Sequence, residues 1–209
     1  MSKLVIVDSN CANLSSVYRA SLAAGLTPQV SGETRDILTA DAIIFPGVGS
    51  FNHAVQALRK QNLITVLQEY FTMNKPFLGI CLGMQLLFDE SEESTKSNDK
   101  DCAGFHLFSG RVVRFTGSLP VPHVGWNQVA PVKQHPLFAG LDEQPYFYFT
   151  HSYYVSPEKP NDQLALTNYG NLFVSAVAKD RIMGVQFHPE KSGTAGLRLL
   201  ANFGNIIAD

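Results

Sequence analysis

The sequence has no long apolar run and no block of basic residues, and each absence excludes a class of protein. No stretch approaches the roughly 20 consecutive apolar residues that cross a bilayer. The first residues also lack the apolar core and small-residue cleavage site of a signal peptide. Lys and Arg do not cluster as they do in nucleic-acid-binding proteins, and the formal net charge is only -2. We therefore expect neither a membrane nor a nucleic acid as a partner.

Cysteine is scarce and irregularly spaced. Cys11, Cys81 and Cys102 form no even framework, so we expect no disulfide scaffold and a cytoplasmic location, where thiols stay reduced. The histidines show no metal-ligand spacing with cysteine or carboxylate side chains, and we expect neither a metal nor another cofactor. Apolar residues make up 45% and charged residues 16% of the 209, which is globular composition. One domain over residues 1–209 is expected.

The first half of the chain alternates short apolar runs with amphipathic stretches. This order predicts an α/β fold, an open and largely parallel twisted sheet with flanking helices. The second half is rich in strand-like segments between Pro, Gly and Asn turns, and we expect it to form a β-rich portion that extends or flanks the sheet. Residues 89–103 are polar and predict a surface loop. Strands are expected at 4–7, 27–30, 41–45, 77–80, 111–115, 126–132, 146–155 and 172–178, and helices at 13–24, 53–59, 63–71 and 194–207.

Cys81 stands between an apolar strand and an expected helix. Gly79 and Gly83 flank it, which is the pattern of a nucleophile elbow, a sharp turn that pushes one side chain into a pocket. The free amides and the dipole at the start of the following helix would favour a nucleophilic thiolate. Taken alone, the pattern has a plain alternative, because a lone cysteine among apolar residues is usually a small buried hydrophobe.

A second segment, GVQFHPE at residues 184–190, contains the other groups that a nucleophilic cysteine needs. Residues two apart on an extended chain point to the same side, so His188 and Glu190 can lie together. His188 would take the proton of Cys81, and Glu190 would orient the imidazole ring. The alternative for His188 is a surface histidine beside a turn proline. Cys81, His188 and the PGVG turn at 46–49 each follow a predicted strand, so one edge of the sheet should hold all three.

Several motifs occur in one order along nearly the whole chain. They are Asp8 with CANL at 11–14, PGVG at 46–49, GICLGMQ at 79–85, PHVGWN at 122–127, HSYY at 151–154 and QFHPE at 186–190. With this set the chain resembles the class I glutamine amidotransferases, triad glutaminases with a GxCxGxQ elbow on a flavodoxin-like α/β sheet. Within that family, the GWN and HSY motifs resemble those of the glutaminase subunits of imidazole glycerol phosphate synthase, from histidine biosynthesis.

The resemblance implies hydrolysis of L-glutamine through a cysteinyl thioester, and the oxyanion formed on the way needs backbone donors. The amide of Leu82 begins the elbow helix and is one expected donor. Val48 is the expected second donor, because Gly47 and Gly49 let the backbone turn its amide inward and let a substrate approach. The alternative for this segment is an ordinary Pro-Gly turn after a strand.

Glutamine also presents an α-ammonium and an α-carboxylate group. Gln85 lies one helical turn past the elbow, on the face that carries the nucleophile. The resemblance places a glutamate at the spacing of Glu93, whose anionic side chain suits the ammonium, whereas the residues alone favour a solvated loop charge. Ser152 and Tyr153 would offer hydroxyl and backbone contacts, although Tyr153 could equally be structural.

Free ammonia would be lost as ammonium in water, and the resemblance implies a partner that receives it. This partner would be the cyclase subunit, a (β/α)₈ barrel on a separate polypeptide, bound as a heterodimer. The candidates for the docking face are Asn13, His123, Gly125, Trp126 and Asn127. Trp126 is the only tryptophan, and tryptophan is enriched at interfaces. A core position for it is equally compatible with the sequence.

Three other functions are compatible with the sequence. The first is a glutaminase that serves purine, anthranilate or surface-sugar amination. The second is a cysteine hydrolase that acts on peptides or γ-glutamyl conjugates without a partner. The third is a binding subunit with a vestigial triad, which is disfavoured because an inactive site has no physical need to keep all three side chains.

Overall fold

The computed structural model describes residues 2–10, 12–95 and 103–208. Within them, strands parallel to their neighbours form one half of the central sheet. Except in the edge strand at residues 28–31, their runs of Val, Ile, Leu and Phe are buried on both faces, as strands between two helical layers must be. In spatial order they are β2 (Pro28–Ser31), β1 (Leu4–Val7), β3 (Ala42–Gly47), β4 (Phe77–Cys81) and β13 (Ile182–Val185).

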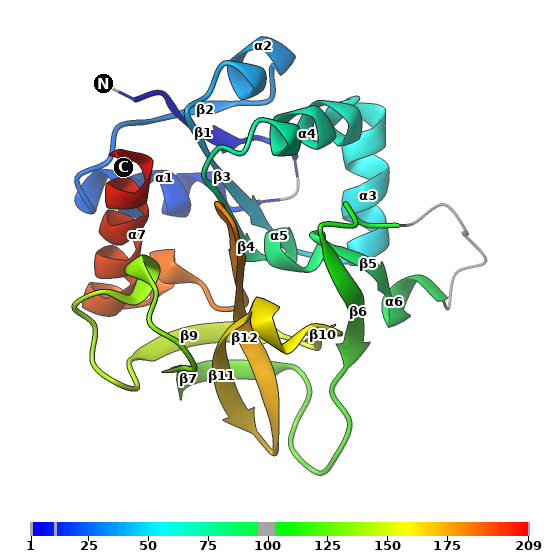
Figure 1. Cartoon of the computed structure of the whole chain (residues 1–209). Helices are drawn as coiled ribbons and strands as arrows, with labels where there is room; N and C mark the ends of the chain where they lie inside the picture. Colours follow the sequence, from blue (N-terminus) through cyan, green and yellow to red (C-terminus); the bar gives the residue numbers. More distant parts are fainter. Residues whose placement is uncertain (1, 11, 96–102, 209) are drawn as a thin grey trace.

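Helices cover both faces of this parallel half. Figure 1 shows α1 (Leu14–Ala23) and α7 (Gly193–Ala208) together on one side, with α3 (Phe51–Lys60) and α4 (Leu63–Thr72) on the other. The short α2 (Thr34–Leu38) packs against α4. Successive side chains of a strand point to opposite faces, and they therefore enter two separate apolar cores.

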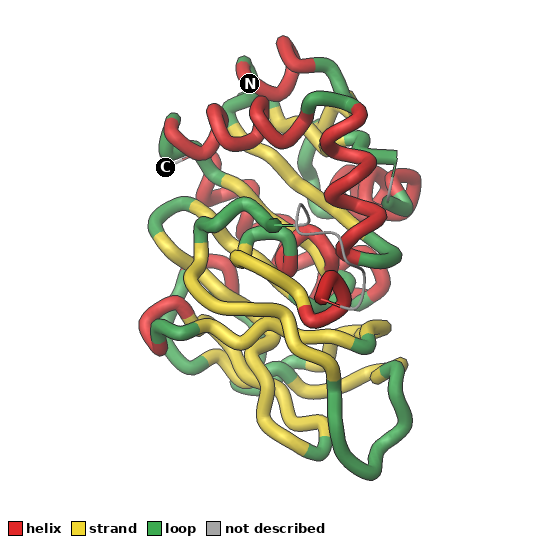
Figure 2. Tube along the Cα trace, turned by 90° about the vertical axis from the view of Figure 1, so that its right-hand side faces the viewer, coloured by secondary structure: helices red, strands yellow, loops and turns green. Residues whose placement is uncertain are grey.

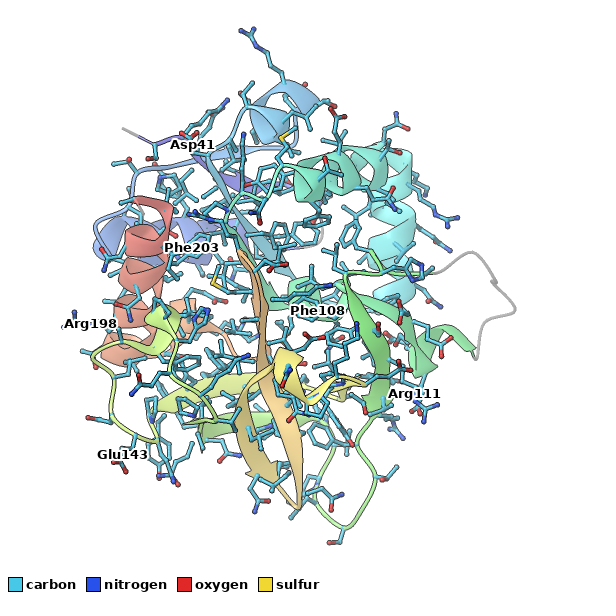
Figure 3. The ribbon with its side chains drawn as sticks, in the orientation of Figure 1. Asp41, Phe108, Arg111, Glu143, Arg198 and Phe203 are labelled. Atoms are coloured by element: carbon cyan, nitrogen blue, oxygen red, sulfur yellow. The ribbon has the colours of Figure 1, made fainter. Side chains whose placement is uncertain are left out.

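The two cores can be followed along β3. Ile44 packs in the core that contains Phe203 of α7, whereas Ile43 and Phe45 pack in the core that contains Phe51 of α3. Figure 3 shows Phe203 and Phe108 inside the molecule, with Arg111 and Glu143 at its periphery. Burial of large apolar side chains on both faces holds the parallel strands at a fixed separation from the helices.

Beyond β13 the sheet continues through mostly antiparallel strands, with its last strand parallel to its neighbour, and forms the β-rich portion. Figure 2 shows most helices gathered at one end of the molecule and these strands at the other. In spatial order the sheet adds β12 (Asn171–Lys179), β10 (Tyr153–Pro157), β6 (Phe108–Arg114) and β5 (Phe88–Ser91), while β11 (Gln163–Tyr169) pairs with β12 and with β8 (Ala130–Pro131). A separate antiparallel pair consists of β7 (His123–Gln128) and β9 (Tyr146–His151). The expected fold class is confirmed.

Local structure after the elbow differs in part from the sequence prediction. The expected helix is present as α5 (Leu82–Gln85) and has four residues. The predicted polar loop at 89–103 was partly wrong, because β5 ends at Ser91 and α6 (Glu92–Thr95) follows it. Phe88 begins this strand and stacks on Phe108 of the parallel neighbour β6, with ring centroids 5.5 Å apart. Because the side chains of β5 that face outward are acidic, the sequence indicated a loop here and not a strand.

The elbow requires close approach of backbone segments. A Cβ at Gly79 would lie 2.6 Å from the carbonyl oxygen of Gly83 and 2.8 Å from its carbon, and both atoms belong to rigid backbone. A Cβ at Gly184, on the neighbouring strand β13, would collide with the Met84 side chain. Glycine at these positions therefore lets α5 lie directly against the strands that carry the site.

We predict that Gly79→Ala lowers the free energy of unfolding by about 1–3 kcal/mol, because the added methyl group must displace backbone. Gly204→Ala is the matched control, since its methyl group meets only the flexible end of Leu26 and alanine favours the helix α7. Urea unfolding of both variants measures the difference. Equal stability of Gly79→Ala and the wild type would contradict the close packing of the elbow.

Candidate active site

Cys81 is the last residue of β4 and has φ 55° and ψ −110°. A non-glycine residue with positive φ is uncommon, and such strain is concentrated at functional sites. Gly47 at the end of β3 is the direct partner of Cys81 in the sheet, and Ile80 pairs with Val185 at the end of β13. The carboxyl ends of three adjacent parallel strands therefore meet at the sulfur, as the sequence predicted.

The segment after β13 alternates between the site and the core. Gln186 and His188 point toward Cys81, while Phe187 between them is buried and stacks on Phe147, with ring centroids 4.0 Å apart. The main chain of His188 is fixed at both ends. Its N–H donates to the Tyr148 carbonyl at 2.9 Å, and its carbonyl accepts from the Ser192 hydroxyl at 2.6 Å.

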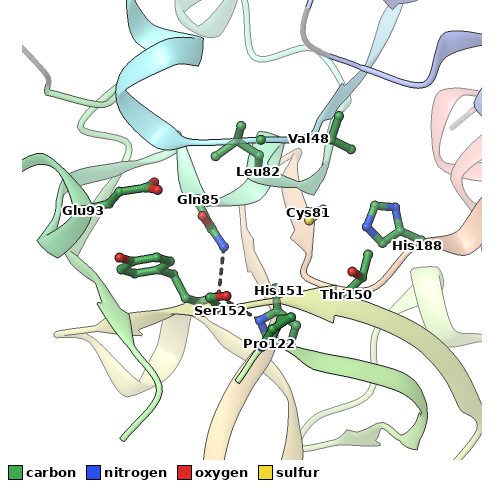
Figure 4. A pocket seen from close by; sticks show the side chains of 12 residues that line it. Val48, Cys81, Leu82, Gln85, Glu93, Pro122, Thr150, His151, Ser152 and His188 are labelled. Atoms are coloured by element: carbon green, nitrogen blue, oxygen red, sulfur yellow. Dashed lines mark hydrogen bonds between the residues drawn. The ribbon is translucent and has the colours of Figure 1, made fainter. Parts of the chain in front are cut away.

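His188 and Glu190 form a buried pair. Nδ1 of the imidazole lies 2.8 Å from Oε1 of the carboxylate, and the two side chains are 2% and 3% exposed. Nε2 of His188 is buried and has no hydrogen-bond partner among the described residues. Figure 4 shows the ring beside Cys81 at one side of the pocket. The carboxylate thus fixes the ring, and the opposite nitrogen is left for a reacting group.

The charge of His188 is set by competing effects. Burial lowers its pKa, but the Cys81 side chain and the Glu190 carboxylate raise the pKa by more, to about 10. The imidazole is therefore protonated at neutral pH in the unliganded site. A protonated ring whose Nε2 faces the pocket can donate a proton to a leaving group there.

A pocket of about 330 Å³ opens over the sulfur, a volume at the lower end of those that hold small molecules. In Figure 4, Glu93 and Gln85 lie on one side of Cys81 and His188 lies on the other. Gly47 and Glu190 are not in its wall: Gly47 lies against α5, and Glu190 lies behind His188. The wall consists of Val48, Gly49, Cys81, Leu82, Gln85, Glu93, Pro122, Thr150, His151, Ser152, Tyr153 and His188.

Two polar side chains in this wall are held by the surrounding main chain. Oε2 of Glu93 accepts the amide of Phe51, the first residue of α3, at 2.7 Å. Nε2 of Gln85 donates to the Tyr153 carbonyl and to Oε1 of Gln186, both at 3.0 Å. Both donor hydrogens of Gln85 are therefore in use, and its carbonyl oxygen remains as an acceptor.

A buried pair of histidines supports the part of the wall formed by residues 150–153. The sequence did not identify this pairing. Nδ1 of His151 donates to the Tyr153 carbonyl at 2.8 Å, and its Nε2 lies 3.0 Å from Nδ1 of His123. Burial lowers the pKa of His151 to about 3, with the charges of His123 and His188 in the same direction and the Tyr153 carbonyl opposed. Burial likewise lowers the pKa of His123 to about 4. Both rings are neutral at physiological pH.

Sequence reasoning also missed Pro122 and Thr150 of the wall and the amide of Gln186. Gln186 could have been found, because it lies two residues before His188 on an extended segment and must share its side. Thr150 follows from the same alternation applied to β9, but the sequence alone does not show which face of that strand meets the site.

The candidate docking residues occupy both faces of β7. Trp126 is 55% exposed, beside Tyr148 of β9 at a ring separation of 6.2 Å. His123 is buried, and Asn127 donates inward to the Asn168 carbonyl at 2.9 Å. Gly125 lies between them at φ 131°.

Asn13 is exposed at the start of α1, away from β7 in the sequence. Its side chain accepts the Ser16 amide at 3.4 Å, so it serves as the helix N-cap. Cys11 and Cys102 lie outside the described residues. In the described part of the chain no cluster of three or more His, Cys, Asp or Glu side chains could hold a metal ion, and no helix has the length and apolarity to cross a membrane.

Comparison with known proteins assigns the family. The family described as "Glutamine amidotransferase class-I" matches residues 5–206. The match covers almost the entire chain and includes the elbow and the segment with His188 and Glu190. The chain belongs to the class I glutamine amidotransferases.

Similar proteins show to which branch of this class the chain belongs. The protein described as "Imidazole glycerol phosphate synthase subunit HisH" from Photorhabdus laumondii is 46% identical over 202 residues, which are 96% of this chain and 98% of that protein. The protein with the same description from Symbiobacterium thermophilum is 43% identical over 209 residues, which are 100% of this chain and 96% of that protein. The chain is thus a member of the HisH branch.

Solved structures agree on the fold. A putative GMP synthase protein from Thermoplasma acidophilum has a TM-score of 0.72 at 19% identity, over 100% of this chain and 94% of that one. A structure described as a glutamine amidotransferase has a TM-score of 0.75 at 16% identity, over 98% and 99% of the two chains. At such identities the likeness concerns the fold alone.

The raised pKa of His188 predicts a pH-dependent contribution to stability. An ordinary histidine titrates near 6.5 and His188 near 10, so folding retains a proton that the unfolded chain releases between these values. The stabilisation is complete below pH 6.5 and is lost as the pH rises toward 10. Compared with His188→Asn, the wild type should therefore lose its relative stability over this range in urea unfolding. A difference that does not change with pH would contradict the assignment.

Proposed function

We propose that this chain is the glutaminase subunit of an imidazole glycerol phosphate synthase. It hydrolyses L-glutamine to glutamate and ammonia at Cys81, and a cyclase subunit uses the ammonia to form imidazole glycerol phosphate and an aminoimidazole carboxamide ribonucleotide in histidine biosynthesis. Two observations support this: the Cys81 and His188 side chains line one pocket, with Glu190 paired to His188 behind it, and the HisH relatives match nearly the full length.

The reaction begins when the Cys81 thiolate attacks the side-chain amide carbon of glutamine. The proton that leaves the thiol is held by His188, whose ring is oriented by Glu190 at 2.8 Å. The C=O π electrons move to the oxygen, and a tetrahedral oxyanion bound to Sγ results. Burial of the triad strengthens these electrostatic interactions because water is excluded from them.

Two backbone amides are proposed to bind the oxyanion. Leu82 follows the sulfur directly and begins α5, so its N–H has no acceptor within that helix. Val48 lies in the pocket wall beyond Gly47, the sheet partner of Cys81. One donor of this kind typically contributes about 10²- to 10³-fold to the rate.

His188 completes the reaction as an acid and then as a base. Its Nε2 proton moves to the amide nitrogen, the C–N bond breaks, and ammonia leaves with Cys81 acylated as a γ-glutamyl thioester. Water then attacks the thioester carbon and gives a proton to His188. The C–S bond breaks, glutamate leaves, and the resting pair is restored.

The polar wall suits the other end of glutamine. The Glu93 carboxylate and the carbonyl oxygen of Gln85 are acceptors, and we assign both to the α-ammonium group. The Ser152 hydroxyl and the main chain at Tyr153 are assigned to the α-carboxylate, and Gly49 gives the substrate access beside Val48.

The cyclase subunit, a (β/α)₈ barrel, is the proposed partner in a heterodimer. Trp126 and Val124 are 55% and 56% exposed on one face of β7, next to the pocket residue Pro122. On the opposite face, His123 and Asn127 support the strand from inside, and Gly125 lies between them. Asn13 is a further candidate, although its capping role already explains it. A docking face at the pocket rim would receive ammonia without its release into water.

We further propose a single amidotransferase domain over residues 1–209 and a cytoplasmic location, where the Cys81 thiol stays reduced.

The alternative functions would each need a different site or a different partner. A peptide hydrolase needs an extended substrate groove, whereas this pocket has the volume of a small molecule. Glutaminases of other pathways pair with other synthases, so activation by the barrel cyclase separates them from the present proposal.

Cys81→Ser should abolish glutamine hydrolysis, because the serine hydroxyl is not ionised beside His188 at neutral pH. In the assembled complex it should leave ammonia-dependent synthesis at the wild-type rate, since that reaction needs only the cyclase site. Glutamate release and imidazole glycerol phosphate formation measure the two activities. Persistent glutamine hydrolysis by the variant would refute the nucleophile assignment.

Trp126→Ala should weaken binding to the cyclase subunit by about tenfold or more, as truncation of a central interface tryptophan does. Met73→Ala, an exposed side chain beyond α4 at the opposite edge of the sheet, is the matched control and should bind normally. Titration calorimetry gives both dissociation constants. Equal constants for the two variants would remove Trp126 from the interface.

A further inference from the structure

The sulfur of Cys81 has a second polar neighbour besides His188. Nε2 of Gln186 donates to Sγ at 3.6 Å, within hydrogen-bond distance for sulfur. Gln186 is fully buried, and its own amide N–H bonds to the Ser175 carbonyl at 2.9 Å. A buried polar side chain directed at the nucleophile needs an explanation, because its desolvation costs free energy unless its groups are paired.

The orientation of this side chain is determined by the main chain. The Tyr153 carbonyl can only accept, so the amide group 3.0 Å away on Gln85 must present its nitrogen there. The same nitrogen faces the Gln186 side chain at 3.0 Å, which must therefore present its oxygen to Gln85. The remaining nitrogen of Gln186 is thus directed at the sulfur, and the reverse orientation would place two donors against each other.

The other side of the Tyr153 carbonyl is fixed in the same way. Nδ1 of His151 donates to it at 2.8 Å, so Nε2 of His151 is the acceptor for Nδ1–H of His123. Nε2 of His123 then accepts from the Asn127 amide at 3.3 Å. Each donor in this series has an acceptor, and no member can rotate alone without leaving a buried group unpaired.

We propose that Gln186 is a positioning residue for the glutaminase reaction: its side-chain N–H holds the Cys81 sulfur opposite His188 and stabilises the thiolate before attack. A donor to the charged form of a thiol favours that form. The inference rests on the proposed function, because it assigns the residue to that reaction. Gln186 does not line the pocket and so acts through the sulfur, without contact to glutamine.

The test uses Gln186→Met and Gln186→Glu, which keep the length of the side chain. Methionine removes the donor, and glutamate replaces it with an anion while it can still accept from Gln85. Each variant is assembled with the cyclase subunit for steady-state hydrolysis of glutamine. Separately, each free chain is alkylated with iodoacetamide over a range of pH, and peptide mapping isolates the reaction at Cys81.

Gln186→Met should lower kcat by about 10- to 100-fold, the usual effect of a hydrogen bond to a charged group, with KM almost unchanged. The pH midpoint of Cys81 alkylation should rise by about one unit, and Gln186→Glu should raise it further. The titratable groups around the sulfur are His188 with Glu190, His151, Tyr153 and Glu93, and neither variant removes any of them.

Thr167→Val is the matched control. It breaks a buried hydrogen bond of 2.8 Å to Ser175, whose carbonyl binds the Gln186 main chain, but it does not touch the sulfur. It should lower thermal stability and leave kcat and the alkylation profile as in the wild type. This control separates a loss of packing from a loss of the sulfur contact.

Wild-type kcat and an unchanged alkylation profile in Gln186→Met would overturn the proposal, as would a loss of stability alone or a rise in KM alone. If Gln186→Met does not fold, Gln186→Glu decides by the same two measurements. If the wild-type complex itself hydrolyses no glutamine, the proposed function fails. The alkylation profiles still decide the role of Gln186 in that case, because they need no substrate.

Discussion

The site depends on the parallel pairing of β3, β4 and β13. Parallel strands end at the same edge of a sheet, so this pairing brings Gly47, Cys81 and the segment that leads to His188 together from three distant parts of the sequence. Glycines at the contact allow α5 to lie against the strands, and the chain reverses at Cys81 in a strained conformation. This strained conformation is unfavourable by itself. The packing of the apolar cores on both faces of the sheet offsets its free energy.

Burial lowers the pKa of all three histidines of the site, and their partners decide whether each ring is charged. His188 is almost fully buried yet protonated, because the Glu190 carboxylate and the Cys81 side chain favour the charged form. His151 and His123 are also buried, but they face a carbonyl, an amide and each other, and burial keeps them neutral. One ring can therefore carry the reacting proton while the other two act as fixed hydrogen-bonding groups.

Much of this arrangement could be predicted from the sequence. The apolar runs indicated the parallel strands, and the pairing of a Gly-flanked cysteine with a His-x-Glu segment led to the proposed triad. The inward direction of His123, against the outward direction of Trp126, could not be predicted, because it depends on which face of β7 meets the core. The strand at Phe88 was hidden for a similar reason: its burial follows from a long-range partner, Phe108, and local polarity indicated a loop.

The two halves of the molecule contribute different parts of the site, and one main-chain oxygen is hydrogen-bonded to both halves. The helical half brings Cys81 and Gln85, and the β-rich half brings His151 and the Tyr153 carbonyl, which accepts hydrogen bonds from both sides. The inner face of β7 is bonded into the same series through His123, while its outer face carries the exposed Trp126. A displacement of β7 would therefore disturb the buried hydrogen bonds that lead from this strand to the sulfur. The position of β7 and the geometry of Cys81 thus depend on each other.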